Sequence, residues 1–189
     1  IGRPREAVNV LRRAIDISQD QRGDESVSPL LLANYARVLR EVARLDEASD
    51  YAERAHRLAV RLGLEGTINH ALLTRARNYL AQGDTDRAEA MLDEVEPRIR
   101  QVLPEGHLTF GAVLAQRSLI AQLRGDLTGA LALADGRLAI IEASMTTGQS
   151  GAYALPVLLL QRSGIRVRAE TSLAAAFAHL AHAGPTAVK

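Results

Sequence analysis

A stripe of small apolar residues recurs five times along this chain at an almost constant interval. The anchoring alanines are Ala7, Ala48, Ala88, Ala130 and Ala169, separated by 41, 40, 42 and 39 residues. Each is followed four residues later by leucine or alanine, and three residues after that by a third residue, which is alanine in three copies. Because positions i, i+4 and i+7 lie on one face of an α-helix, each copy predicts a helix with a narrow face of small side chains. The constant interval predicts a repeat array.

The segment GDTDRAEAMLDEV at 83–95 shows how each copy begins. Gly83 is a turn residue and Asp84 an N-cap residue, so a tight turn is expected to precede the helix. Ala88 and Ala90 are expected on its buried face, where they would allow a neighbouring helix to lie close. Residues that play the same turn or cap role in other copies are Gly2, Ala43, Asp46, Gly125, Asp126 and Gly164.

A second stretch with helical periodicity lies upstream of four of these copies. These stretches span residues 30–43, 68–81, 109–123 and 153–163. Each unit is therefore predicted to be a helix, a short turn and a second helix. Loops are expected at 18–28, 63–67, 103–107 and 144–151. Strand-like alternation is missing, so the predicted fold is all-α, without a sheet.

Two prolines bear on the helix bounds. Pro97 falls inside a predicted helix and predicts a kink or an early stop, because proline lacks the backbone N–H that a helix interior uses. Pro156 suits a first helical turn, which predicts that the first helix of the last unit begins near Leu155.

Composition narrows the classes of function. The net charge is +1, from 23 basic and 22 acidic residues, so no overall field favours nucleic acid or an anionic membrane surface. Cysteine is absent, which excludes disulfides and thiolate metal sites and fits a cytoplasmic protein. The longest apolar run, at 154–160, is too short to cross a bilayer.

These residues resemble the tetratricopeptide repeat (TPR) family, from Gly2 to about His182. The turn and stripe match that family's second helix, and small residues at Ala36, Ala76 and Ser118 match its first. The interval is similar to the long, 42-residue variant of kinesin light chains and of many bacterial signalling proteins. The resemblance implies a right-handed α-solenoid and one repeat domain over 1–189, which we expect to be a fragment of a longer chain. Its units would be about 1–19 (partial), 29–62, 67–101, 108–143 and 152–183.

By the same resemblance, the concave face formed by the first helices would bind a peptide or a partner protein. The residues expected there are Asn34, Arg37, Arg40, His70, Thr74, Arg77, Gln116, Gln122, Gln161 and Arg162. Asn34 with Arg37, and Thr74 with Arg77, repeat a polar and a basic residue three positions apart on one helix face. Such a ladder would suit an extended acidic segment. The alternative, a solvated face with unrelated arginines, stays open.

Other functions have less support in the sequence. A regulatory or sensor segment of a bacterial signalling protein, such as a kinase or a transcriptional regulator, is the alternative to a scaffold module. GxGxxG, HRD and DFG motifs are absent, so any kinase domain is expected to lie outside this chain. The sequence offers no catalytic constellation, so we expect neither catalysis nor a cofactor in this chain. His179 and His182 lack an accompanying carboxylate or thiolate, so no metal site is expected. A partial first unit exposes its N-terminal edge, which predicts a homodimer or docking on further sequence.

Overall fold

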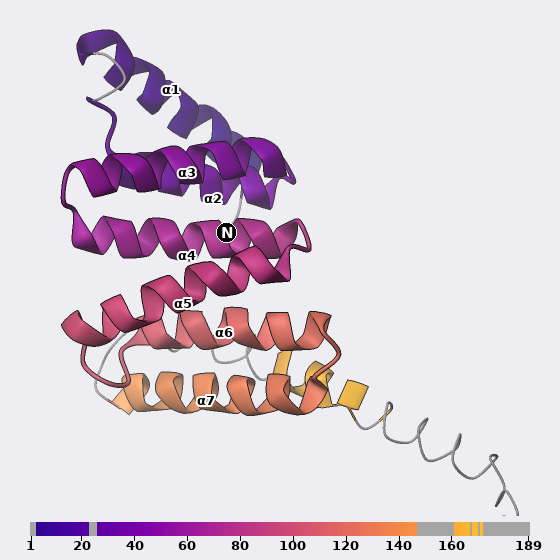
Figure 1. The fold of residues 1–189 in the computed structure, drawn as a ribbon. Coiled ribbons are helices and arrows are strands. Elements are labelled where there is room, and N and C mark those ends of the chain that lie inside the picture. Colours follow the sequence, from indigo (N-terminus) through magenta and orange to yellow (C-terminus); the bar gives the residue numbers. More distant parts are fainter. Residues whose placement is uncertain (1–2, 23–25, 147–160, 167, 170, 172–189) are drawn as a thin grey trace, which may run out of the picture. The chain divides into compact units, whose positions relative to one another are not determined.

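The computed structural model describes residues 3–22, 26–146, 161–166, 168–169 and 171, and this part of the chain is helical without any strand, as expected. Seven helices have defined bounds within these residues (Figure 1): α1 Pro4–Arg22, α2 Pro29–Glu41, α3 Leu45–Arg61, α4 Glu65–Ala81, α5 Thr85–Val102, α6 Leu108–Leu123 and α7 Leu127–Thr146. None of the helices in the described part is long and apolar enough to cross a membrane.

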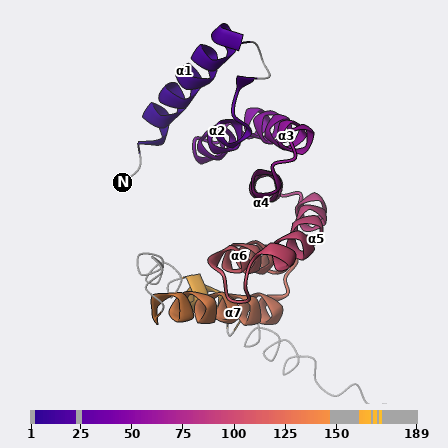
Figure 2. The ribbon, with the colours of Figure 1, turned by 90° about the vertical axis from the view of Figure 1, so that its left-hand side faces the viewer.

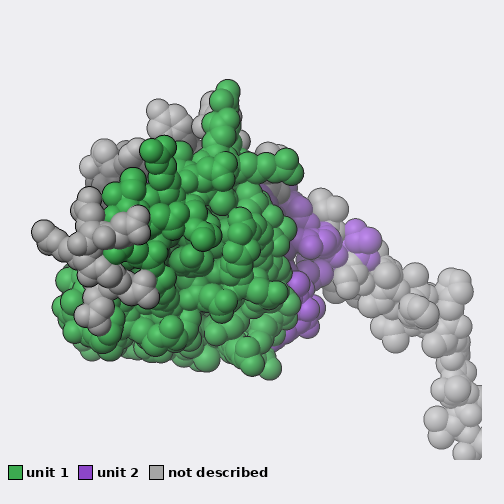
Figure 3. All heavy atoms as spheres, turned by 90° about the horizontal axis from the view of Figure 1, so that it is seen from above, with its two compact units in different colours: residues 1–105 green, residues 106–189 purple. Residues whose placement is uncertain are grey.

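The chain divides into two compact units, residues 1–105 and 106–189 (Figure 3). In the first unit, α2 packs on α3, α3 on α4 and α4 on α5 as sequential antiparallel neighbours. Helix α2 also contacts α4, so the first helices of two successive pairs adjoin each other. Figure 2 shows α2 and α4 on one side of this unit, with α3 and α5 on the other.

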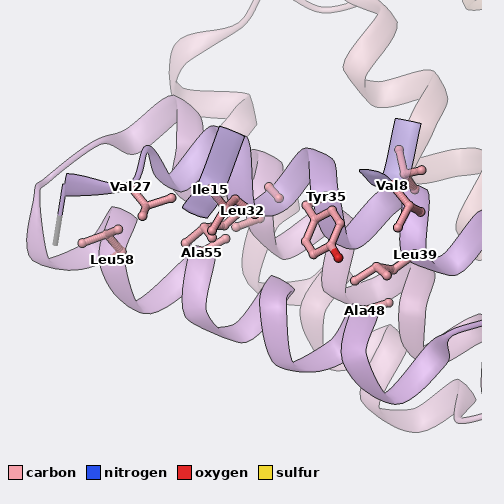
Figure 4. Packing of buried hydrophobic residues seen from close by; sticks show 12 residues of the cluster. Val8, Ile15, Val27, Leu32, Tyr35, Leu39, Ala48, Ala55 and Leu58 are labelled. Atoms are coloured by element: carbon pink, nitrogen blue, oxygen red, sulfur yellow. The ribbon is translucent and has the colours of Figure 1, made fainter. Parts of the chain in front are cut away.

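The core of the first unit combines alanines from α3 with larger side chains from α2. Ala48, Ala52 and Ala55 have no exposed surface, and the same is true of Leu32 and Leu39. Figure 4 shows Leu32 and Leu39 pointing toward the alanine face of α3. Because alanine has only a methyl side chain, the facing helix can approach α3 closely enough to bury its leucines.

Helix α5 confirms the stripe but corrects one of its members. Ala88, Leu92 and Val95 are completely buried, as predicted. Ala90, predicted on the same face, is exposed. The reason is geometric: two residues along an α-helix are about 200° apart around its axis, so Ala90 points away from the neighbour that covers Ala88.

The turns between paired helices follow one hydrogen-bonding scheme. At the end of α4, the N–H of Gly83 donates to Leu80 C=O at 3.1 Å and the N–H of Asp84 donates to Tyr79 C=O at 2.9 Å. This is a Schellman motif, whose turn residue is left-handed; Gly83 has φ 81°. Asp84 then caps α5, because its Oδ1 accepts the N–H of Arg87 at 3.0 Å.

The equivalent turn after α2 uses alanine in place of glycine. Ala43 has φ 61°, and the N–H of Arg44 donates to Leu39 C=O at 3.0 Å, as in the other turns. A left-handed conformation costs an L-residue on the order of 1 kcal/mol, so the surrounding packing must hold it there.

Pro97 does not stop its helix. Helix α5 continues through it to Val102, so an early stop, one of the two outcomes predicted, is wrong. Val95 and Ile99, on either side of the proline, are 0% and 1% exposed, and their burial outweighs one missing backbone hydrogen bond. The predicted start of a helix near Leu155 lies outside the described residues.

The second unit contains α6, α7 and a helical stretch at 161–166. Its core includes Val113, Ile120, Ala130 and Ile141, each at most 5% exposed. Ser118 occupies the small-residue position of α6, and its hydroxyl donates to Ala130 C=O at 2.8 Å. A serine is tolerated between these helices because its hydroxyl has an acceptor.

A buried amide joins three helices of the first unit. Asn78 on α4 is 1% exposed, and its Nδ2 donates to Ala48 C=O on α3 at 2.8 Å. Its Oδ1 accepts a hydrogen bond from Nη1 of Arg40, on α2, at 3.1 Å. One side chain therefore links α4 to α3 and to α2 and uses both ends of its amide.

Enlarging the side chain at the stripe should destabilise the fold. Ala88→Leu should lower the free energy of unfolding by about 1–3 kcal/mol, because the buried position has no room for three further carbons. Urea denaturation followed by circular dichroism measures the change. Ala90→Leu is the matched control, since it adds the same atoms at an exposed position, and it should stay within about 0.5 kcal/mol. Equal effects of the two substitutions would contradict the assigned helix face.

Removing the buried amide should also destabilise the first unit. Asn78→Ala deletes two hydrogen bonds and should cost about 1–3 kcal/mol of unfolding free energy. Asn34→Ala on α2, where the side chain is only partly buried, makes the same change in helix propensity and controls for it. If urea denaturation shows no difference between these two variants, Asn78 does not hold the helices together.

Candidate functional site

Four basic side chains gather where α2 and α4 adjoin. Arg37 and Arg40 come from α2, and His70 and Arg77 come from α4; we call this set the basic face. All four are partly buried. Their positions follow from helix period, because Arg37 and Arg40, like His70 and Arg77, lie one or two turns apart along one side of their helix.

The members of the basic face differ in how their charge is balanced. Arg37 is paired within its own helix, with Nη1 at 2.8 Å from Glu41 Oε1. Arg40 is held by the neutral amide of Asn78. Arg77 makes no hydrogen bond or ion pair with any residue in the described ranges. Glu41 is thus the carboxylate that offsets this group of cations, and it is already bound by Arg37.

Burial and neighbouring positive charges lower the pKa values of Arg40, His70 and Arg77. Burial lowers the pKa of Arg77, and the nearby Arg37 lowers it further. The pKa of Arg40 is lowered first by burial and then by Arg77, against a smaller raising effect of Glu41. The pKa of His70 is lowered by burial, Arg77 and Arg37, in that order. Like charges held in a partly desolvated place disfavour one another, so an anion bound here would relieve this repulsion.

The predicted polar partners of these arginines take different positions. Asn34 lies on α2 and is partly buried. Thr74 is 4% exposed, and its hydroxyl donates to His70 C=O at 2.9 Å within α4. The Nε2 atom of His70 is buried without a hydrogen-bond partner. Thr74 therefore satisfies its hydroxyl inside its own helix, whereas His70 retains an unused ring nitrogen.

The other four predicted residues belong to the second unit, and each has a partner there. Gln116 is 4% exposed, with Nε2 donating to Ala112 C=O at 3.4 Å. Gln122 accepts a hydrogen bond from Arg168, and Gln161 accepts one from Arg137 at 3.3 Å.

Arg162, the last of the ten, is bound to Asp135. This hydrogen-bonded carboxylate raises the pKa of Arg162. Each of these four side chains thus has a hydrogen-bond partner within the second unit, whereas Arg77 has none in the described residues. The predicted residues thus gather into a basic face in the first unit alone.

Two groups of interest were not singled out from the sequence. Asn78 sets the position of Arg40, and the signal for it was an asparagine inside the apolar stretch 68–81. His56 and Arg75 lie elsewhere in the first unit, with Arg75 Nη1 3.4 Å from His56 Nδ1. The histidine pair His179 and His182 lies outside the described residues, and no group of three metal-binding side chains occurs within them.

The depressed pKa of His70 predicts that the fold loses stability in acid. The unfolded chain binds a proton at the ordinary histidine pKa, whereas the folded chain binds it only at lower pH. The contribution to stability is therefore complete above the ordinary pKa and is lost as the pH falls through and below it. The free energy of unfolding should be lower at about pH 5.5 than at about pH 7.5. Burial lowers the pKa of His56 as well, so both groups act in the same direction. Urea denaturation at both pH values should show a smaller loss for His70→Gln and a smaller one still for His56→Gln/His70→Gln; an unchanged loss would contradict the assignment.

The fold is similar to that of solved kinesin-light-chain-like repeat proteins. No protein-family model and no curated protein matches the sequence. The structure of BtubC (BKLC) from P. vanneervenii matches with a TM-score of 0.62 and 20% identity, over 92% of this chain and 74% of that one. A putative kinesin light chain of Podospora anserina with nearly identical TPR-like repeats matches with a TM-score of 0.61 and 19% identity, over 89% of each chain. A second structure of that protein, with one residue substituted, matches with a TM-score of 0.61 and 18% identity, over 90% of each chain. The helix pairs described above are therefore TPR-like repeats, as the sequence predicted.

Proposed function

We propose that the basic face of α2 and α4 binds an acidic segment of a partner protein. TPR-like repeats generally serve as protein-binding modules, and the first helices of such repeats adjoin here as α2 and α4. The observation that carries the proposal is Arg77, a partly buried cation with no carboxylate partner in the described part of the chain.

The charge balance favours an acidic occupant over a neutral one. After burial, the charges of neighbouring arginines are the next cause that lowers the pKa of Arg40 and Arg77. Glu41 is the carboxylate that faces them, and Arg37 already binds it. A glutamate or aspartate side chain brought to Arg77 would form a charge-assisted hydrogen bond in a partly desolvated place, where such bonds are stronger than on an open surface.

The other arginines would contribute less. Arg37 must share its guanidinium with Glu41, and Arg40 is already oriented by Asn78. We therefore assign Arg77 as the main anchor, with Arg40 as a fixed second donor and Arg37 as a rim charge. His70 adds a buried, unused ring nitrogen beside them.

Two further predictions stay untested. A regulatory segment in a larger signalling protein would use the same face, and its partner would then be another part of its own polypeptide. A dimer through the N-terminal edge would bury α1, where Val10 and Ile17 are 68% and 50% exposed and lie seven residues apart on one side of the helix.

Peptide binding tests the proposal. The probe is a short fluorescent peptide of alternating glutamate and alanine, and its counterpart with glutamine should bind much more weakly. Arg77→Gln should weaken binding of the acidic peptide by about tenfold or more, since a hydrogen bond to a charged group contributes about 1.5–3 kcal/mol. Arg37→Gln should have a smaller effect.

Arg13→Gln is the control, because it removes one positive charge from an exposed position on α1. It should change the affinity only slightly, and raised salt should reduce that slight change further. Fluorescence anisotropy measures all these affinities. Equal affinity of the wild type and Arg77→Gln, or equal binding of the glutamate and glutamine peptides, would refute the proposal.

A further inference from the structure

A second basic site lies on another side of the first unit. A pocket of about 810 Å³ is lined mainly by the C-terminal half of α3, with Arg75 of α4 as its contribution from the next helix. Arg75 and Arg77 are two residues apart, so they point about 200° apart around α4. This pocket is therefore separate from the basic face to which the acidic segment is assigned.

Arginine dominates the lining of this pocket. Arg54, Arg57 and Arg61 lie at positions i, i+3 and i+7 of α3, which places them along one side of that helix, and Arg75 joins them from α4. Glu53 is the carboxylate among the lining residues. Four guanidinium groups therefore line this pocket, and one carboxylate lies among them.

The single carboxylate is already divided between two of these arginines. Glu53 Oε2 lies 2.8 Å from Nη2 of Arg75, and its Oε1 lies 3.4 Å from Nη1 of Arg57. Arg75 is mostly buried, with 16% of its side chain exposed, whereas Arg57 is 65% exposed. Arg75 thus forms the floor of the pocket and Arg57 its rim.

The floor holds two hydrogen-bond donors that have no acceptor. Nη1 of Arg75 lies 3.4 Å from Nδ1 of His56, and because a guanidinium only donates, Nδ1 must be the accepting nitrogen. The ring proton is then on Nε2 of His56, which is buried without a partner, as is Nε of Arg75. Burial and the charge of Arg75 lower the pKa of His56, which agrees with a neutral ring. Buried donors without acceptors are costly, and an acceptor oxygen supplied by a ligand would remove that cost.

The carboxylates around this floor do not accept hydrogen bonds from its two unpartnered donors. The charges facing His56 from α5 are Glu94 and Arg98, which act on its pKa in opposite directions. Glu94 does not accept a hydrogen bond from the ring N–H, since Nε2 of His56 has no partner in the described residues. Arg98 is paired with Glu65 of α4, with Nη2 at 2.8 Å from Oε2, so that carboxylate is also engaged elsewhere.

Size and apolar lining narrow the ligand class. The volume falls in the range of about 300–1,000 Å³ that is typical of sites for small organic ligands, and exceeds what inorganic phosphate needs. Leu58 and Val60 add apolar surface to the lining. Guanidinium groups bind phosphate oxygens in pairs, and this is the anion that several adjacent arginines suit best. We propose that this pocket binds a phosphorylated small molecule of about nucleotide size, with the phosphates on Arg75, Arg57 and Arg61.

Nuclear magnetic resonance titration tests the site directly. The probes are pyrophosphate, ADP and adenosine, and the readout is the Nε–H signal of Arg75 together with the ring signals of His56. ADP and pyrophosphate should shift these signals with saturation, ADP at the lower concentration, and adenosine should leave them unchanged. The proposal is overturned if neither ADP nor pyrophosphate shifts them.

Variants locate the phosphates within the pocket. Arg75→Gln should weaken ADP binding by about tenfold or more, and Arg57→Gln, at the exposed rim, by roughly threefold. Because Arg75→Gln also removes an ion pair, its folding is checked by circular dichroism, and Arg57→Gln provides the test that leaves the floor intact. ADP affinity unchanged by both substitutions would overturn the proposal.

The matched control is Arg77→Gln, on the same helix but on the basic face. It should leave the affinity for ADP unchanged while it weakens binding of the acidic peptide. Arg57→Gln should weaken binding of ADP and leave the affinity for the acidic peptide unchanged. The two sites can thus fail independently, because each has its own probe and its own variant.

Discussion

Close helix packing over methyl side chains is the constraint on which the first unit depends. Helix α3 carries only methyl side chains at Ala48, Ala52 and Ala55, so its neighbours can approach it closely. Helix α2 packs on one side of it and α4 on another. This arrangement also brings α2 into contact with α4. As a result Arg37 and Arg40 lie beside His70 and Arg77, although some thirty to forty positions separate the two groups in sequence. Packing of the smallest side chains thereby creates the electrostatics of the candidate site.

Helix α4 contributes to two different basic surfaces because Arg75 and Arg77 point to different sides of it. Arg77 adjoins α2 on the basic face and has no carboxylate partner in the described residues, whereas Arg75 adjoins α3 and shares Glu53 with Arg57. Asn78, one residue after Arg77, is buried and bonds α4 to α2 and α3. The same few residues thus set the packing of α4 and place the cations on its two sides.

Local rules account for what could be predicted. Helix period, the turn at Gly83 and the cap at Asp84 depend on residues within one turn of each other, and all three appear in the structure as expected. Ala90 was misplaced because its size was considered without its angle around the helix. At Pro97 a local preference was outweighed by the burial of Val95 and Ile99, which depends on a neighbouring helix.

The candidate site was predictable only in part. Arg37, its i,i+4 partner Glu41 and Arg77 could be found from their spacing, whereas the gathering of Arg77 beside Arg37 and Arg40 depends on how α2 and α4 pack. The sequence by itself determined the helix pairs and their small-residue faces, because period and capping are written in adjacent turns. The tertiary structure alone decided that Asn78 binds across three helices and that Arg75 meets His56 and Glu53, because each of these contacts joins residues from different helices.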